Sequence, residues 1–298
     1  MKNPNFYYSL ILICTLLSCN YKDKNTKDIK GNKTFAPESY IKILDNSLHQ
    51  NSGLILWNKH FWTFNDSGGK NEIYGLDFIT GKILYTVQIV NAVNVDWEDI
   101  AQDQDFIYIA DTGNNYGNRH HQKIYRIRKN DINSETVQTV KAQSITFQFA
   151  DQVNFTHAHH HSEYDCEALF AFNDSLFVFT KDWIHFITKV YGFPAKIGSY
   201  SVLPIDSFNV KGLITGADIL PNGKFALIGY MNFHPFIWMF QKTPSNFFSN
   251  PRFISLGKLL NAQTEGICFS PKGDLFISNE KTENYKSQIW KINRKKLK

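Results

Sequence analysis

The sequence contains few cysteines, only four in 298 residues, and two of them, Cys14 and Cys19, lie close to the N-terminus. Cys166 and Cys268 remain for the rest of the chain. We expect each to lie in the first strand of a different repeat, in registers that differ by one residue, so that they point to different faces of their sheets. The sequence therefore predicts two buried thiols rather than a disulfide bridge.

Short motifs of several functional classes are also missing. The sequence has no Gly-x-Ser-x-Gly elbow, no phosphate-cradling glycine loop, no His-Glu-x-x-His pair and no EF-hand spacing. Its net charge of +5 is modest, and most basic residues lie singly or near the termini. Because nucleic-acid binding needs a continuous basic groove interleaved with aromatic side chains, we expect no nucleic-acid partner.

A hydrophobic run of any length occurs only near the N-terminus. Lys2 is followed by an apolar run over residues 6–17, which is too short to span a bilayer but typical of a signal-peptide core. The run ends at Leu16-Leu17-Ser18-Cys19, which resembles the bacterial lipobox, where the cysteine becomes the lipidated first residue. The sequence thus predicts a signal peptide over residues 1–18 and a Cys19 that carries palmitate or a similar lipid. The alternative is an ordinary secretory signal that contains a cysteine.

This N-terminus predicts a lipoprotein of the bacterial cell envelope, anchored to a membrane and exposed on the extracytoplasmic (periplasmic) side. Residues 19–39 are polar, lysine-rich and poor in large apolar side chains, which predicts a disordered tether. Residues 40–298 then form one folded domain, which we expect to be a monomer. The 25 Phe and 14 Tyr of the chain favour strands over helices, since aromatic side chains suit a pleated surface.

A repeating unit of four strand-like segments organises this domain. The first segments are NSGLILW, WEDIAQD, CEALFAF, TGADILP and TEGICFS, and the second are HFWTFND, FIYIADT, LFVFTKD, FALIGYM and LFISNEK. Each third segment contains an aliphatic–aromatic pair, as in Ile73-Tyr74 and Ile289-Trp290. The fourth segments cover residues 82–89, 145–149, 199–203 and 253–256. Five such units predict an all-β fold, a β-propeller with five four-stranded blades.

Two irregularities bear on the closure of the ring. The fifth unit lacks a fourth strand, whereas residues 40–44 form a strand without a unit of their own. Joining the two would close the ring and remove exposed sheet edges. Residues 129–163 lengthen one interval between repeats, which we interpret as an insertion within blade two. A degraded sixth blade is the alternative.

Acidic residues gather at one end of these repeats. The starts of first strands and the ends of second strands meet on one face of a propeller, around the mouth of its channel. We expect calcium ligands there, because calcium prefers flexible sets of oxygen atoms: Glu98, Asp111, Glu167 and Glu265. A bound ligand would contact neighbouring side chains, for which the candidates are Lys181, Arg119, His120, Tyr230 and Glu280. Asp66, Asp96, Asp165, Asp182 and, just inside blade four, Asp218 are further candidates for this face.

Alternatives exist for parts of this set. In the loops that follow Asp66 and Asp111, aspartate and asparagine could serve only to build turns. The histidines of residues 157–161 could bind zinc, copper or nickel. Consecutive histidines on a mobile loop rarely make a fixed site, and the loop could instead cover the channel mouth as a lid.

Several segments together resemble a known group of proteins. Trp97-Glu98-Asp99-Ile100-Ala101, the segment from Tyr108 to Asn115 with Arg119, Asp165-Cys166-Glu167-Ala168-Leu169 and Ile214-Thr215-Gly216-Ala217-Asp218 resemble a family of uncharacterised bacterial secreted β-propellers. This family is distantly similar to the phytase-like and gluconolactonase-like propellers. The resemblance covers most of residues 52–293, and implies an extracytoplasmic propeller with an acidic, calcium-binding face. It implies no particular activity.

Two functions remain open from the sequence. One is a membrane-tethered propeller that binds a small-molecule or protein ligand at its acidic face together with calcium. The other is a calcium-dependent hydrolase of a phosphoester or lactone, with His120 or Lys181 as acid or electrostatic stabiliser. Phytase activity is disfavoured, because only Lys181, Arg119 and Lys281 are available to bind several phosphates.

Overall fold

The computed structural model describes residues 33–155 and 158–297. The predicted signal peptide, the predicted lipidation site Cys19 and His157 lie outside these residues. The described chain is all-β apart from four short 3-10 helices, η1 (Asn46–Leu48), η2 (Lys129–Asp131), η3 (Gly257–Leu259) and η4 (Arg294–Leu297). In this part of the chain we find no helix with the length and apolarity needed to cross a membrane.

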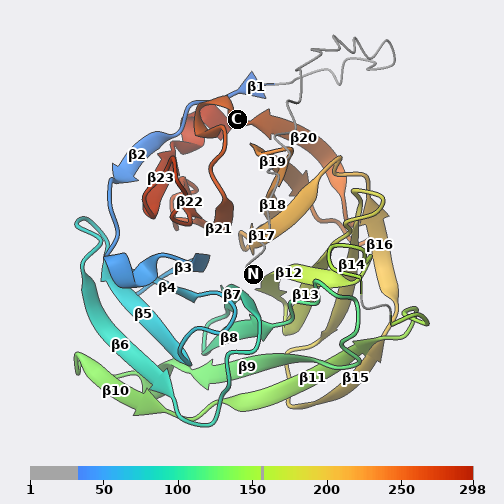
Figure 1. Cartoon of the computed structure of the whole chain (residues 1–298), viewed down its shortest axis with the longest axis horizontal. Helices are drawn as coiled ribbons and strands as arrows, with labels where there is room; N and C mark the ends of the chain where they lie inside the picture. Colours follow the sequence, from blue (N-terminus) through green and yellow to red (C-terminus); the bar gives the residue numbers. More distant parts are fainter. Residues whose placement is uncertain (1–32, 156–157, 298) are drawn as a thin grey trace, which may run out of the picture. The chain divides into compact units, whose positions relative to one another are not determined.

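The strands form five sheets around a common axis, which confirms the predicted five-bladed propeller (Figure 1). Blade one contains β3 (Asn51–Trp57), β4 (His60–Asn65), β5 (Glu72–Asp77) and β6 (Ile83–Ile89). Blade two contains β7 (Trp97–Gln102), β8 (Phe106–Asp111), β9 (Gln122–Arg128) and β11 (Gln143–Phe149). Blade three contains β12 (Asp165–Phe172), β13 (Ser175–Lys181), β14 (Thr188–Pro194) and β16 (Pro204–Phe208).

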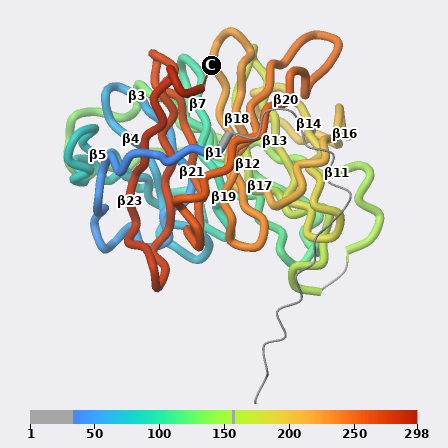
Figure 2. Tube along the Cα trace, turned by 90° about the horizontal axis from the view of Figure 1, so that it is seen from above, coloured from blue at the N-terminus to red at the C-terminus, as the bar shows by residue number. Residues whose placement is uncertain are grey.

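Blade four contains β17 (Leu213–Ile219), β18 (Lys224–Met231), β19 (His234–Gln241) and β20 (Ser249–Ser255). Blade five contains β21 (Thr264–Phe269), β22 (Leu275–Asn279), β23 (Gln288–Ile292) and β2 (Glu38–Ile41). The first strand of each blade is innermost and contacts the first strands on either side, so that β21 meets β3 and the ring is closed. Seen from above, the strands run across the thickness of the ring (Figure 2).

An N-terminal strand closes blade five, as the sequence predicts, but it covers Glu38–Ile41 and not the predicted residues 40–44. In β2, Glu38 and Ser39 pair antiparallel with Lys291 and Trp290 of β23. The ring of Tyr40 packs 5.0 Å from that of Phe276 in blade five and 5.4 Å from that of Phe78 in the turn between β5 and β6 of blade one. Residues 33–39, predicted as tether, thus include the start of β2 and also β1 (Lys33–Thr34), which pairs parallel with β20.

Two further strands cover the outer edges of blades. The insertion over residues 129–163 forms β10 (Val137–Val140), which pairs parallel with β6 of blade one, and no sixth blade forms in the described chain. The assignment of residues 199–203 to blade three is wrong: β15 (Gly198–Val202) pairs parallel with β11 of blade two, and β16 completes blade three. Both additions pair backbone groups that an outer edge would otherwise expose.

Packing between blades is apolar, and it includes both remaining cysteines. Cys166 lies in the cluster between blades two and three, and Cys268 in the cluster between blades five and one. Both are buried free thiols, which confirms the prediction.

At the centre, Asp99 of β7 accepts hydrogen bonds from the backbone N–H groups of Leu169 (2.8 Å) and Ala217 (3.2 Å), and so joins three inner strands.

Candidate functional site

A β-bulge interrupts the inner strand of every blade near the same end. The bulged residue is Glu98 in blade two, Glu167 in blade three, Thr215 in blade four and Glu265 in blade five. A bulge turns the extra residue out of the regular alternation and can thereby redirect its side chain. Three glutamates are thus presented at one end of the ring, and all three are buried.

Glu98 lies against two aspartates from neighbouring loops. Asp66 follows β4, Asp96 precedes β7, and carboxylate oxygens of these three residues lie within 4.8 Å of one another. We call Asp66, Asp96 and Glu98 the carboxylate trio. The backbone holds the two loops, because Asp66 N–H donates to Gln50 O (2.9 Å) and Asp96 N–H donates to Asp111 Oδ1 (3.1 Å).

Gly113 has no side chain, and this makes room for the carboxylates of the trio. A Cβ at this position would lie 2.1 Å from Glu98 Oε1 and 2.2 Å from Asp96 Oδ2, far closer than atoms can approach. A side chain at this position would therefore have to displace the carboxylates of Glu98 and Asp96 from their present positions.

The carboxylates of the trio repel one another in a poorly solvated site. Burial, and then the neighbouring Asp66 and Asp165, raise the pKa of Asp96 to about 7. Burial also raises the pKa of Asp66 to about 6 and that of Glu98 well above its usual value. Glu98 is only 5% exposed. Its carboxylate accepts no hydrogen bond from the described residues, so it lacks a partner that would stabilise its charge.

The opposite side of the channel mouth contains a cation of its own. Lys181, at the end of β13, forms a buried ion pair with Glu167 at 2.5 Å. Its ammonium also lies over the rings of Trp183 (4.7 Å) and Tyr230 (5.5 Å). Burial lowers the pKa of Lys181, but Glu167, followed by Tyr230 and Glu265, more than offsets this effect and raises it overall. Lys181 therefore stays protonated.

Two more glutamates adjoin this pair. Burial is the largest cause that raises the pKa of Glu265 to about 7, with Lys181 opposing it and Asp66 reinforcing it. Burial and the adjacent Glu265 raise the pKa of Glu280 to about 9. At neutral pH this side of the mouth thus holds protons on some of its acids, which limits their repulsion.

Arg119 neutralises Asp111. Its guanidinium nitrogens lie 3.1 and 3.2 Å from Asp111 Oδ1, and they also donate to the backbone oxygens of Gly113 (3.0 Å) and Asp111 (2.9 Å). Arg119 thus fixes the loop that places Gly113 under the trio. Among the four predicted metal ligands, Asp111 and Glu167 have cationic partners, whereas Glu98 has none in the described chain.

His120 lies apart from these residues. Its ring stacks on that of Phe155 at 3.8 Å, and with Gln148, Gln152 and Ser201 it lines a separate surface pocket. The structure therefore brings Arg119, Lys181, Tyr230 and Glu280 to the channel mouth and places His120 outside it.

The histidine-rich loop contacts the rim of the mouth. His160 N–H donates to Asn115 O (2.9 Å), and the His160 ring stacks on Trp183 at 3.8 Å with His159 behind it at 3.7 Å. Trp183 in turn donates its indole N–H to Asp165 Oδ2 (2.7 Å). Within the described residues, His159, His160 and His161 belong to no cluster of three metal-ligating side chains.

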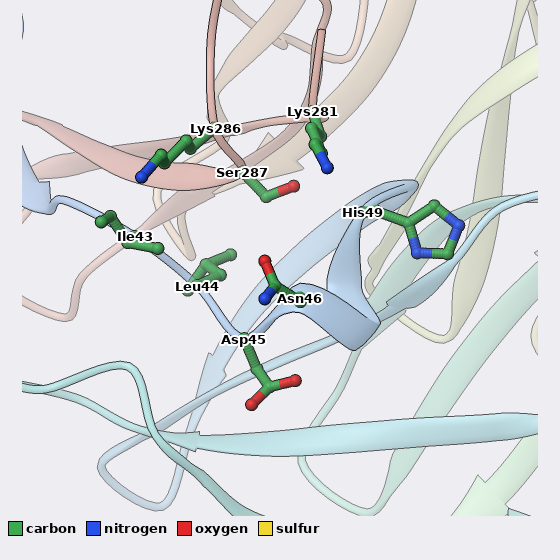
Figure 3. Close-up of a pocket in the computed structure, with 8 residues that line it drawn as sticks. All are labelled: Ile43, Leu44, Asp45, Asn46, His49, Lys281, Lys286 and Ser287. Carbon is green, nitrogen blue, oxygen red and sulfur yellow. The ribbon is translucent and has the colours of Figure 1, made fainter.

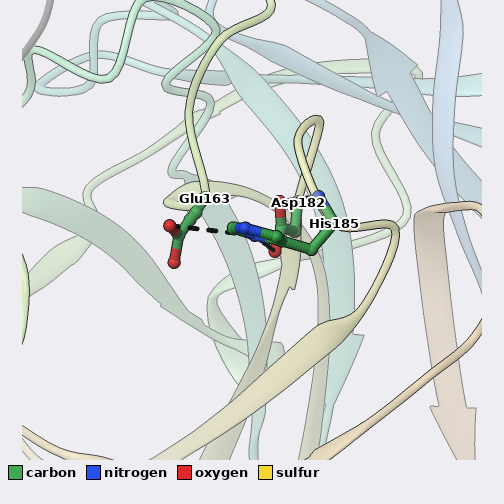
Figure 4. A group of neighbouring side chains, drawn as sticks. All are labelled: Glu163, Asp182 and His185. Atoms are coloured by element: carbon green, nitrogen blue, oxygen red, sulfur yellow. Dashed lines mark hydrogen bonds and ion pairs between the residues drawn. The ribbon is translucent and has the colours of Figure 1, made fainter.

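Glu163, Asp182 and His185 form a second group of metal-ligating side chains (Figure 4). His185 Nδ1 lies 3.1 Å from Asp182 Oδ2 and 3.8 Å from Glu163 Oε1. Each acid is already engaged, since Asp182 Oδ1 accepts the N–H groups of Ile184 and His185, and Glu163 pairs with Lys189 at 3.4 Å. These contacts describe an ion-pair network that ties blade three to its preceding loop.

Sequence reasoning placed Asp66 and Asp96 on this face without naming them as metal ligands. It assigned Gly113 to the tight turn after Asp111, and it missed Trp183. A signal for the aspartates was available, because the loop from Asp66 to Gly69 parallels the loop from Asp111 to Gly113. No local pattern indicated Trp183, whose contact with His160 depends on the loop that precedes β12.

No protein-family model matches the chain, and no curated protein matches it in sequence. Solved structures match it in fold. Aldose sugar dehydrogenase from Streptomyces coelicolor, in its PQQ-bound form, has a TM-score of 0.53 at 10% identity, over 87% of this chain and 97% of that chain. Regucalcin, a calcium-binding protein from Agrobacterium tumefaciens, has a TM-score of 0.47 at 9% identity, over 88% and 95% of the two chains.

A gluconolactonase from Xanthomonas campestris has a TM-score of 0.44 at 12% identity, over 82% of this chain and 71% of that chain. The similarity to the sugar dehydrogenase supports the β-propeller fold. At such low identities the similarity establishes the fold and transfers no activity.

Proposed function

We propose that this protein is a ligand-binding β-propeller of the bacterial cell envelope that binds a calcium ion at its channel mouth and is tethered to a membrane through Cys19. The observation that supports the ion is the carboxylate of Glu98. It is buried, lacks a donor in the described chain, and lies within 4.8 Å of the carboxylates of Asp66 and Asp96. Buried charge of this kind requires a cation, a proton or a hydrogen-bond donor.

The donor set fits calcium. The trio offers up to six hard oxygen atoms from three carboxylates, and calcium accepts mono- or bidentate carboxylates in flexible geometry. Gly113 keeps the space between Asp96 and Glu98 free of a side chain. Asp66, Asp96 and Glu98 would hold the ion, while Arg119 and Lys181 hold the flanking acids Asp111 and Glu167 in place.

A ligand at this mouth would meet an ion on one side and the Lys181 ammonium on the other. Tyr230 and Trp183 add aromatic surface beside that ammonium. Such a site suits a polar ligand with oxygen atoms for the ion and an anionic group for Lys181.

Thermal melts with calcium and with a chelator test the ion. Calcium binds only the folded ring, so a hundredfold excess over its Kd should raise the Tm of the wild type by about 5 °C or more. Glu98→Gln should abolish this response, and it should preserve or raise the metal-free Tm because repulsion within the trio falls. Glu163→Gln, outside the mouth, is the matched control and should keep the response. A wild type that is indifferent to calcium would remove the basis of this proposal.

A calcium-dependent hydrolase of a phosphoester or lactone is the second candidate. The observation that favours it is Glu265, whose pKa of about 7 allows proton exchange at neutral pH beside Lys181. Calcium would supply a Lewis acid, Glu265 would hold or release a proton, and Lys181 would stabilise negative charge. Glu265→Gln should then keep the calcium response and lose turnover of a phosphoester or lactone. Absence of turnover in the calcium-loaded wild type would leave only the binding function.

Anchoring is tested by cell fractionation. Residues 6–17 cannot hold the protein after cleavage, and residues 20–39 are polar, so Cys19→Ala should release the protein from the membrane fraction. Cys14→Ala, within the predicted signal peptide, should leave the protein membrane-bound. Full membrane retention of the Cys19→Ala protein would contradict the lipid anchor.

A further inference from the structure

A small pocket lies between the segment that follows β2 and the loop that joins β22 to β23 (Figure 3). Its volume is about 90 Å³, which suits a single small group rather than a drug-sized ligand. Three basic side chains line it, together with Ser287, Asn46, Asp45 and two apolar residues. The basic residues are His49, Lys281 and Lys286.

The hydroxyl of Ser287 is the buried polar group of this pocket. Ser287 is 5% exposed, and its Oγ has no hydrogen-bond partner in the described chain. The residue itself is held in place, because its backbone oxygen accepts a hydrogen bond from Leu44 N–H (2.8 Å). A buried hydroxyl without a partner costs free energy, so a hydrogen-bonding ligand at this position would remove that cost.

The charges around Ser287 favour an anion. Neither Lys281 nor Lys286 forms an ion pair within the described residues, whereas the one carboxylate of the pocket is engaged. Asp45 Oδ1 accepts hydrogen bonds from Ser47 N–H (2.9 Å) and Ser47 Oγ–H (2.8 Å) at the start of η1. In the view of Figure 3, the Ser287 hydroxyl and the Lys281 ammonium lie on the pocket side, and the Asp45 carboxylate points away from both lysines.

We propose that this pocket binds a small tetrahedral oxyanion, a phosphate group that is either free or the terminal group of a phosphomonoester. Lys281 would supply the charge beside the Ser287 hydroxyl, which would donate one hydrogen bond, and Lys286, whose ammonium lies on the far side in Figure 3, would turn its flexible side chain toward the anion. The site is independent of the calcium site, although the two lie at the same end of the ring. Lys281 directly follows Glu280, and its N–H donates to His49 O (2.9 Å), while the adjacent Gln50 O accepts from Asp66 N–H.

Titration with inorganic phosphate by calorimetry tests the site. The full mature chain is used with a chelator present, so that the result does not depend on calcium. We expect saturable binding to the wild type, while chloride at equal ionic strength produces none. The double variant Lys281→Gln, Lys286→Gln should show no binding, and Ser287→Ala should bind about tenfold more weakly without losing metal-free stability. Lys272→Gln, on the turn at the other end of blade five, is the matched control.

These titrations distinguish specific phosphate binding in the pocket from nonspecific attraction of anions to positive surface charge. Equal phosphate binding by the double variant, or an unchanged affinity of Ser287→Ala, would overturn the proposal, as would a wild type that binds no phosphate. A parallel titration with glycerol 3-phosphate identifies the source of the group. Binding at least as tight as that of phosphate assigns the pocket to a phosphomonoester, and binding of inorganic phosphate alone assigns it to the free ion.

Discussion

Blades two and three place a glutamate at the same position of the inner strand, in a bulge that follows Trp97 in one blade and Cys166 in the other. The strand that pairs with it supplies different neighbours. Asp111 lies opposite Trp97 and Thr180 lies opposite Cys166, so Thr112 in blade two is equivalent to Lys181 in blade three. Lys181 gives Glu167 an ammonium partner, whereas the Thr112 hydroxyl donates to Cys166 O (2.7 Å) and leaves Glu98 without one.

The same β-bulge therefore produces two electrostatically different sites, one in blade two and one in blade three. In blade three the buried glutamate has a cation of the protein at 2.5 Å, although burial still holds its pKa well above the usual range. In blade two the glutamate faces two further carboxylates, and only a proton or an external cation can compensate it. One residue at the end of the second strand decides between a structural ion pair and a candidate metal site.

Replacing Lys181, the cation of blade three, should have the largest effect on stability. Lys181→Met leaves Glu167 buried without its partner, which should lower the free energy of unfolding by about 3–5 kcal/mol. Urea denaturation measures the loss. The double variant Lys181→Met, Glu167→Gln should recover most of it, because no isolated charge remains. A loss below about 1 kcal/mol in the single variant would show that the pair is not the main partner of Glu167.

Filling the space at Gly113 in blade two should have a smaller effect on stability. Its main effect should be on calcium binding. In Gly113→Ala the new methyl group would displace the carboxylates of Asp96 and Glu98, at a cost of about 1–3 kcal/mol. The calcium-induced shift in Tm should disappear. Gly257→Ala, where the nearest atom to an added Cβ lies at 3.4 Å, is the control and should keep the shift. An undiminished calcium response in Gly113→Ala would separate Gly113 from the cation site.

The smallest expected effect is a change in how the stability of the metal-free protein depends on pH. The pKa values of Asp66 and Asp96 rise on folding to about 6 and about 7, so between pH 4 and pH 7 the folded state binds more protons than the unfolded state. Stability should thus fall as the pH rises through this range. Replacing Asp96 by Asn should reduce this fall by on the order of 1–2 kcal/mol, because solvent screens this partly exposed carboxylate and reduces the effect of its pKa shift on stability. Stabilisation by calcium should grow over the same range, because the ion competes with protons for the trio. Parallel slopes for wild type and variant would contradict the raised pKa of Asp96.

The repeats could be predicted from the sequence because the strands of each blade must bury the apolar side chains that alternate along them. WEDIAQD and CEALFAF predict inner strands through local composition, and the missing fourth strand of blade five predicts closure by the N-terminal strand, now seen in β2. The placement of β15 on blade two was not predictable from its own residues. A strand at the outer edge is specified by the free edge that it covers, and that edge exists only in the assembled sheet.

The sequence by itself determined the all-β repeat, the two buried thiols and the end of the ring at which the acids gather. The tertiary structure decided which acids meet. Asp66, Asp96 and Glu98 come from two blades and the loops between strands, and their distances depend on how tightly neighbouring inner strands pack around the axis. Their unusual pKa values follow from the same packing, because desolvation and repulsion act between residues that are close in space and distant along the chain.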